Sequence, residues 1–113
     1  MENQEELMPF INLEDIAERD MIPGFSARFV HSRFMTFSYW NTKAGYTLPE
    51  HSHPHEQVTN IIQGTFEITV DGETQIIEPG SVVIIPPNAK HRGKSITDCY
   101  ILDVFHPVRE DYK

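Results

Sequence analysis

Turn signals recur along this chain every six to ten residues from Pro23 onward, and their spacing limits what it can fold into. Asp71-Gly72 is the strongest of them, because a type I′ hairpin turn needs positive φ at both central residues. Pro79-Gly80 is a second turn signal. The runs between the turns are short and rich in Val, Ile, Phe, Tyr and Thr, and no helical period of useful length follows residue 20. The pattern therefore predicts an all-β domain, either a sandwich or a barrel.

The segment before these strands has a different pattern. Residues 1–9 form an acidic tail that ends at Pro9, and Asn12 then offers a helix N-cap. We expect one or two helical turns over residues 12–19. The chain thus divides into an N-terminal tail with a short helical turn, residues 1–24, and a single barrel domain, residues 25–113. The expected strands cover residues 25–31, 34–41, 58–63, 65–70, 73–77, 81–85 and about 96–105.

Composition narrows the classes of partner. The 113 residues are 39% hydrophobic, which is enough for one domain with a small core. Asp and Glu outnumber Lys and Arg 17 to 9, and the net charge of −8, with no local basic patch, argues against nucleic acid and anionic membranes as partners. No apolar run approaches a membrane span, and the acidic start carries no visible secretory signal. The single cysteine, Cys99, has no intramolecular partner, so we expect a buried thiol and a cytoplasmic protein.

Several predicted strands are apolar on both faces. Val82 and Ile84 alternate with Val83 and Ile85, and the strand over residues 34–41 has the same character. A two-layer domain of this size cannot cover both faces of its sheets by itself. A homodimer that buries an outer face is therefore expected, and the alternative is that the N-terminal segment folds over that face.

Histidines concentrate in one short segment. His51 and His53 are two residues apart, so both imidazoles face the same side of an extended chain, and Gln57 keeps that parity. His55 shares the parity, so spacing does not exclude it as a ligand. His91 follows the Pro86-Pro87-Asn88 turn and can supply a further imidazole from a distant strand. Three imidazoles and an amide oxygen predict a site for a divalent transition metal, and the alternative is a surface turn with several exposed histidines.

Two motifs resemble those of the cupin family. The run Gly45-x5-His51-x-His53-x3-Gln57-x6-Gly64 resembles the first cupin motif, with Gln where Glu is usual. The run Gly80-x5-Pro86-x-Asn88-x2-His91 resembles the second, with Asn88 in place of Gly and Ser95 in place of Asn. The resemblance implies a double-stranded β-helix, or jelly-roll barrel, with a metal inside. It assigns the metal ligands as His51, His53, Gln57 and His91. Three imidazoles and one amide would accept Ni, Zn, Fe, Mn or Cu, so the residues leave the identity of the metal open.

The Gln57 departure has a chemical consequence, because a neutral amide leaves the charge of the site at +2 where a carboxylate would lower it to +1. The ion becomes a stronger Lewis acid, which favours polarising a substrate oxygen over activating dioxygen. The resemblance leaves His55 out of the ligand set, and we expect it at the rim of the site, where it orients a neighbouring ligand.

The last predicted strand carries one carboxylate among apolar residues. Asp103 shares a face with Cys99, Ile101 and Phe105, and a buried carboxylate is costly unless it is paired or functional. Arg109 follows after Pro107. Either the two form an ion pair that pins the tail, or Asp103 faces the metal cavity with Arg109 at its mouth.

A narrower resemblance covers residues from about 26 to 112. The runs 51–57, 85–88 and 102–112 are similar to the small single-domain cupins of pectin and alginate breakdown. Those proteins linearise 4,5-unsaturated monouronates to 5-keto-4-deoxyuronate, so the expected ligand is a small acidic sugar. The resemblance implies catalytic roles for Asp103, Phe105 and Arg109. The alternatives are a metal-dependent dioxygenase or isomerase for another small acid, a non-catalytic cupin that binds a small ligand, and a structural barrel with an adventitious metal.

Overall fold

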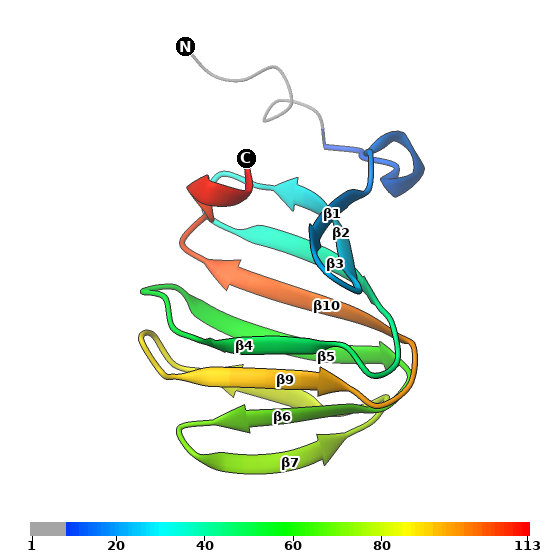
Figure 1. The fold of residues 1–113 in the computed structure, drawn as a ribbon. Helices are drawn as coiled ribbons and strands as arrows, with labels where there is room; N and C mark the ends of the chain where they lie inside the picture. The colour runs from blue at the N-terminus through cyan, green and yellow to red at the C-terminus, as the bar shows by residue number, and fades with distance from the viewer. Residues whose placement is uncertain (1–8) are drawn as a thin grey trace.

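The structure, a computed structural model, describes residues 9–113 of the chain. Two antiparallel sheets face each other and account for most of it (Figure 1), so the predicted all-β jelly roll is confirmed. The six-stranded sheet contains, in spatial order, β1 (Arg19–Ile22), β2 (Phe25–His31), β3 (Thr36–Thr42), β10 (Cys99–His106), β5 (Glu56–Gln63) and β8 (Val82–Ile85). The four-stranded sheet contains β4 (Thr47–His51), β9 (His91–Ser95), β6 (Phe66–Val70) and β7 (Glu73–Ile77).

The predicted turns have the expected backbone. Asp71 and Gly72 have φ of 47° and 84°, as a type I′ connection between β6 and β7 requires. Gly64 has a φ of 92°, and a Cβ there would lie 2.3 Å from the carbonyl oxygen of Asp98. That position therefore needs glycine for its backbone conformation and for its close packing.

The N-terminal prediction is partly wrong. Asn12 does cap a helical turn by accepting a hydrogen bond from the Glu14 amide at 3.0 Å, but the turn is the 3-10 helix η2 (Leu13–Asp15) and not a helix over residues 12–19. Arg19–Ile22 is strand β1, which pairs antiparallel with β2. An isolated helix of two turns is marginal in water, whereas a strand added to a sheet edge gains backbone hydrogen bonds. The acidic tail expected over residues 1–9 lies, apart from Pro9, outside the described residues.

Two strands, β4 and β9, were not predicted. In β9 the buried His91 and Ser95 alternate with the exposed Arg92 and Lys94, so the period of two is present but its inward residues are polar. The strand expected from about residue 96 is also displaced, since β10 begins at Cys99 and the amides of Ile96 and Thr97 bond to the Thr65 carbonyl. The apolar content of a segment therefore predicts a strand poorly where the side chains that point inward are polar.

The core fills one half of the space between the sheets. Its buried residues are Phe25, Ile61, Phe66, Ile68, Ile77, Ile85, Ala89, Cys99 and Ile101. Cys99 is buried there, as predicted. The inward face of β3 is different, because Thr36, Ser38 and Thr42 are buried while Phe37 and Tyr39 turn outward. Of the inward residues of β3 only Trp40, which packs against the core, is apolar, so the expectation that this strand is apolar on both faces is wrong for most of its inward face.

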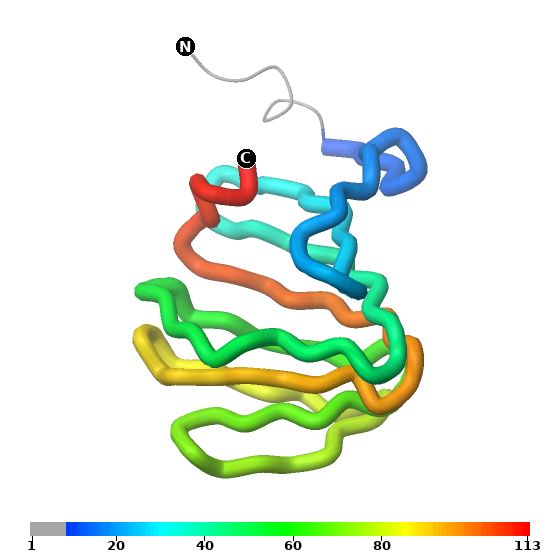
Figure 2. The backbone as a smooth tube through the Cα atoms, in the orientation of Figure 1, coloured from blue at the N-terminus to red at the C-terminus, as the bar shows by residue number. Residues whose placement is uncertain are grey.

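The strand order places the C-terminal residues over one end of the sheets. β10 lies between β3 and β5, and the chain then enters the short 3-10 turn η3 (Glu110–Tyr112), drawn in red beside β2 and β3 in Figure 2. The rings of Tyr112 and Phe29 lie 4.6 Å apart, which ties this turn to β2. Among residues 9–113, no helix has the length and apolar character to cross a membrane.

Candidate metal centre

Three histidines converge, two from the neighbouring strands β4 and β9 and one, His53, from the loop that follows β4. His51 ends β4 and pairs with His91 at the start of β9, and their ring centroids are 4.1 Å apart. The His53 ring lies 4.9 Å from that of His91. One nitrogen from each ring can be chosen so that all three lie within 4.8 Å of one another. The predicted convergence of these three side chains is therefore present.

Each of the three rings is oriented by a backbone carbonyl. The Nδ1 atoms of His51, His53 and His91 lie 2.9, 3.0 and 2.9 Å from the carbonyl oxygens of Pro49, His55 and Ala89. A carbonyl oxygen only accepts, so Nδ1 carries the proton in each ring and Nε2 is left as a lone-pair donor to a metal.

The electrostatics keep two of these rings neutral. Burial lowers the pKa of His91 to about 4. Burial, followed by the positive charge of Arg109, lowers the pKa of His53. His91 Nε2 is buried without a hydrogen-bond partner among the described residues. A buried neutral imidazole nitrogen without a partner is unfavourable in itself and suits a metal ligand.

Gln57 lies beside this group on β5. Its Oε1 is 3.0 Å from His53 Nε2, and its Nε2 donates to Thr59 Oγ1 at 3.0 Å. The ring proton of His53 lies on Nδ1, where it is donated to the His55 carbonyl. His53 Nε2 and Gln57 Oε1 are therefore both acceptors and repel each other. A cation bound between these two atoms would remove that repulsion. Two ligand atoms at roughly 2.1 Å from a metal and at a right angle lie about 3.0 Å apart, so this spacing fits a divalent transition-metal ion.

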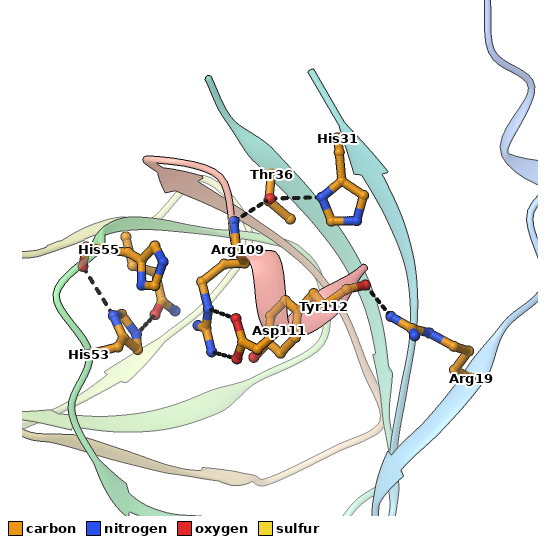
Figure 3. Close-up of polar contacts among 9 residues, drawn as sticks. Arg19, His31, Thr36, His53, His55, Arg109, Asp111 and Tyr112 are labelled. Atoms are coloured by element: carbon orange, nitrogen blue, oxygen red, sulfur yellow. Dashed lines mark hydrogen bonds and ion pairs between the residues drawn. The ribbon is translucent and has the colours of Figure 1, made fainter. Parts of the chain in front are cut away.

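His55 lies outside the three-histidine group. Its carbonyl accepts the hydrogen bond from His53 (Figure 3). The ring centroids of His55 and Phe105 lie 6.5 Å apart. His55 thus orients the neighbouring His53 ring, but it does so through its backbone carbonyl.

Asp103 lies in the middle of β10, between Ser38 on β3 and Thr59 on β5. The Thr59 hydroxyl donates to Asp103 Oδ1 at 2.7 Å. Burial raises the pKa of Asp103 to about 6, against the opposing effect of the Thr59 hydrogen bond. A carboxyl with a pKa near neutrality can both accept and release a proton.

Arg109 forms its ion pair with Asp111. Its Nε and Nη2 donate to the two Asp111 oxygens at 3.0 and 2.7 Å (Figure 3), and the guanidinium holds the pKa of Asp111 below its usual range. The same guanidinium stacks 4.8 Å from the Phe105 ring centroid and 4.0 Å from that of Tyr112. The alternative of an Asp103–Arg109 ion pair is therefore not the arrangement formed.

A single cavity connects these groups. Its lining includes His51, Gln57, His91, Asp103, Phe105 and Arg109. Sequence reasoning missed three contributors around it. Thr59 could have been found from its parity with Gln57, whereas Asp111 and Tyr112 follow Arg109 in a tail with no periodicity to mark them. The cavity lies between the apolar core and the C-terminal turn and has a volume of about 60 Å³.

Two facing antiparallel sheets with inward histidines from adjacent strands define a cupin-type barrel whose histidine group could hold a metal ion. In agreement, the family model of the cupin domain (Cupin_2) matches residues 38–105. The chain belongs to the cupin family.

The relatives that the chain resembles include proteins of pectin degradation. It is 31% identical over 64 residues to the pectin degradation protein KdgF of Dickeya dadantii (strain 3937), a match that covers 55% of this chain and 58% of that protein. The structure of KdgF from Halomonas sp. is 26% identical, with a TM-score of 0.85 and coverage of 92% of this chain and 96% of that one. An RmlC-like cupin from Shewanella frigidimarina NCIMB 400 is 24% identical with a TM-score of 0.89, covering 94% and 96% of the two chains, and it supports the fold alone. The chain matches less than two thirds of the length of its curated relatives.

Proposed function

We propose that this cupin converts 4,5-unsaturated monouronates to linear 5-keto-4-deoxyuronate with the help of a divalent transition metal. Its ligands in this proposal are His51, His53, Gln57 and His91. The observation that carries the proposal is that Asp103 and Arg109 line the same cavity as His51, Gln57 and His91. The similarity to KdgF, a protein named for pectin degradation, supports the choice of a uronate.

The cavity size favours a single sugar acid. At roughly 10–15 Å³ per enclosed water, 60 Å³ accommodates about four to six waters, or about 120–180 Å³ of liquid. A monosaccharide acid is of this size, and an oligosaccharide is not. Arg109 lines the cavity, and its Nη1, which the ion pair with Asp111 does not use, can donate a charge-assisted hydrogen bond to an anionic substrate.

The reaction is an isomerisation in which one proton moves from oxygen to carbon. Asp103 accepts the proton of the anomeric hydroxyl, the bond between C1 and the ring oxygen breaks, and C1 becomes an aldehyde. The ring oxygen then remains on C5 as an enolate, which becomes the C5 ketone when Asp103 returns the proton to C4. A bound metal would supply Lewis-acid stabilisation of the developing negative charge. Arg109 binds the substrate carboxylate, and Phe105 packs against the sugar.

The test is to incubate metal-loaded protein with unsaturated monouronate and follow the loss of double-bond absorbance. We expect turnover by the wild type and a decrease of about 10²–10⁴-fold for Asp103→Asn, because it removes the proton carrier. Arg109→Ala should raise KM strongly. The exposed β1 and β9 substitutions Asp20→Asn and Lys94→Ala are the matched controls. Wild-type rates in both Asp103→Asn and Arg109→Ala would refute the assigned roles.

We also propose that two copies associate through the outer face of the six-stranded sheet. Ile84, Val82 and Ile62 on this face are 64%, 59% and 48% exposed. Ile84 also begins a row of outward apolar side chains that are paired from strand to strand across the sheet. The row consists of Ile84, Val58, Val104, Phe37 and Val30. Such a row suits an isologous contact with a second copy.

Sedimentation equilibrium tests this association. We expect a wild-type dimer and an Ile84→Glu monomer, because a buried unpaired carboxylate is unfavourable at an interface. Ile76→Glu, at a similarly exposed isoleucine of β7, should remain a dimer. A monomeric wild type would contradict the proposal.

A further inference from the structure

We propose that Thr59 is a positioning residue that turns the oxygen of the Gln57 amide toward the metal. The inference rests on the proposed ligand role of Gln57 and goes further by assigning what orients that ligand. It starts from the difference between an amide and a carboxylate. A carboxylate offers an oxygen in either orientation, whereas an amide offers oxygen on one side only and an N–H pair on the other.

A chain of directed hydrogen bonds runs from Asp103 to Gln57. The single hydroxyl proton of Thr59 goes to Asp103 Oδ1 at 2.7 Å. The Thr59 oxygen therefore acts as an acceptor toward Gln57, and it receives the amide Nε2–H at 3.0 Å. With the nitrogen held on this side, Oε1 faces His53 Nε2 at 3.0 Å. The direction of each bond follows from the one before it.

Without this chain, the opposite orientation of the amide would be favoured in the metal-free protein. A flipped Gln57 would direct its N–H group to the lone pair of His53 Nε2, forming a hydrogen bond and removing an acceptor–acceptor contact. It would also occupy the metal-facing lone pair of His53. The flip is opposed because the Gln57 oxygen would then face two acceptors. One is the Thr59 oxygen, whose proton is committed to Asp103, and the other is the Asp103 carboxylate, which also accepts from the Gln57 amide.

Burial makes this opposition effective. Thr59 is 3% exposed and Gln57 is 6% exposed, so solvent has little access to satisfy a flipped amide. All three members of the chain lie on neighbouring strands of one sheet, with Thr59 paired in register with Asp103. Their relative positions are therefore fixed by backbone pairing.

The experiment is a Co²⁺ titration of chelator-treated protein, followed by calorimetry and by the visible absorption of the bound ion. Thr59→Val keeps the shape and removes the hydroxyl, and we expect it to weaken Co²⁺ binding by about 10–100-fold. Thr59→Ser keeps the hydroxyl and should bind within about threefold of the wild type. Wild-type affinity in Thr59→Val would overturn the inference.

A double-mutant cycle separates positioning from a structural role. Gln57→Glu provides a ligand that needs no orientation, so Thr59→Val should cost little Co²⁺ affinity when it is added to Gln57→Glu. An equal loss in both backgrounds would mean that Thr59 acts through the fold and would overturn the inference. If Gln57 is not a ligand, Gln57→Ala will bind Co²⁺ like the wild type, which would also overturn it. None of these measurements uses a uronate, so failure of the proposed reaction would be seen separately.

Discussion

The interior of this barrel has two halves with opposite chemistry, and the inward face of β10 passes through both. Cys99 and Ile101 belong to the apolar core, and Ile101 also forms part of the apolar wall of the cavity. Asp103 and Phe105 continue that lining toward Arg109. Two residues along the strand therefore separate a side chain that stabilises the fold from one whose charged form is penalised by burial. The comparison teaches that stability and chemistry are divided here by position along the same strands, since the sheets that form the core also carry the site.

The energetic roles of the two halves differ accordingly. Burial of an isoleucine side chain such as Ile101 stabilises the fold by roughly 1.5–3 kcal/mol. In the polar half, burial raises the pKa of Asp103 and lowers that of His91, which means that both groups lose solvation on folding. Such a cost is typical of sites kept for binding or catalysis. Substitutions on the two sides should therefore separate metal binding from stability.

The largest expected effect is on metal binding. His91→Ala removes one of three converging imidazoles, and we expect Co²⁺ affinity to fall by more than about 100-fold while the metal-free protein stays folded. His106→Ala, at the exposed end of β10, is the control and should bind normally. Calorimetric titration of both proteins makes the measurement, and an unchanged affinity in His91→Ala would remove it from the ligand set.

The next effect is on stability. Ile101→Ala should lower the free energy of unfolding by about 2–5 kcal/mol, because it removes buried methyl groups and leaves a cavity in the apolar half. Ile76→Ala, at an exposed isoleucine, should change it by less than about 0.5 kcal/mol. Urea unfolding of metal-free protein gives both values. If Ile101→Ala also lost Co²⁺ binding at temperatures where it is folded, the division into two halves would not hold.

The smallest effect concerns pH. The pKa of His91 falls from 6.5 to about 4 on folding, so the unfolded chain takes up the proton first and His91 destabilises the metal-free protein as the pH decreases through that window. The pKa of Asp103 rises from 3.8 to about 6, so the folded chain takes up the proton first and Asp103 opposes this trend. The Asp103→Asn variant lacks this stabilising protonation. Between pH 6 and 4 its free energy of unfolding should therefore fall by about 1–3 kcal/mol more than that of the wild type.

Urea titrations of the two metal-free proteins at several pH values measure this difference. A parallel decline in wild type and Asp103→Asn would show that Asp103 is not the group that offsets the histidines.

Much of the fold could be predicted from the sequence because turns are local. Asp71-Gly72 needs only its own backbone to form a hairpin, and the β-branched runs on either side form the strands. The predicted helical turn over residues 12–19 was too long. The Asn12 cap is a local signal, whereas the pairing of Arg19–Ile22 with β2 depends on residues further along the chain. β9 was missed because its buried residues are His91 and Ser95, which no apolar period marks. β4 was missed because it turns only Leu48 and His51 inward and its register shifts between them.

The sequence by itself determined the all-β class, the proposed ligands His51, His53 and Gln57, and the alternation that puts Asp103 with Ile101. The single shared face expected for those three ligands did not form, because His51 ends β4, His53 lies in the loop that follows, and Gln57 belongs to β5 of the other sheet. Only the tertiary structure decided that His91 lies opposite His51, that Asp111 pairs with Arg109, and that Thr59 stands between Asp103 and Gln57. The physical reason is that a period of two tells which residues of one strand share a face, whereas the choice of neighbouring strand depends on long-range packing.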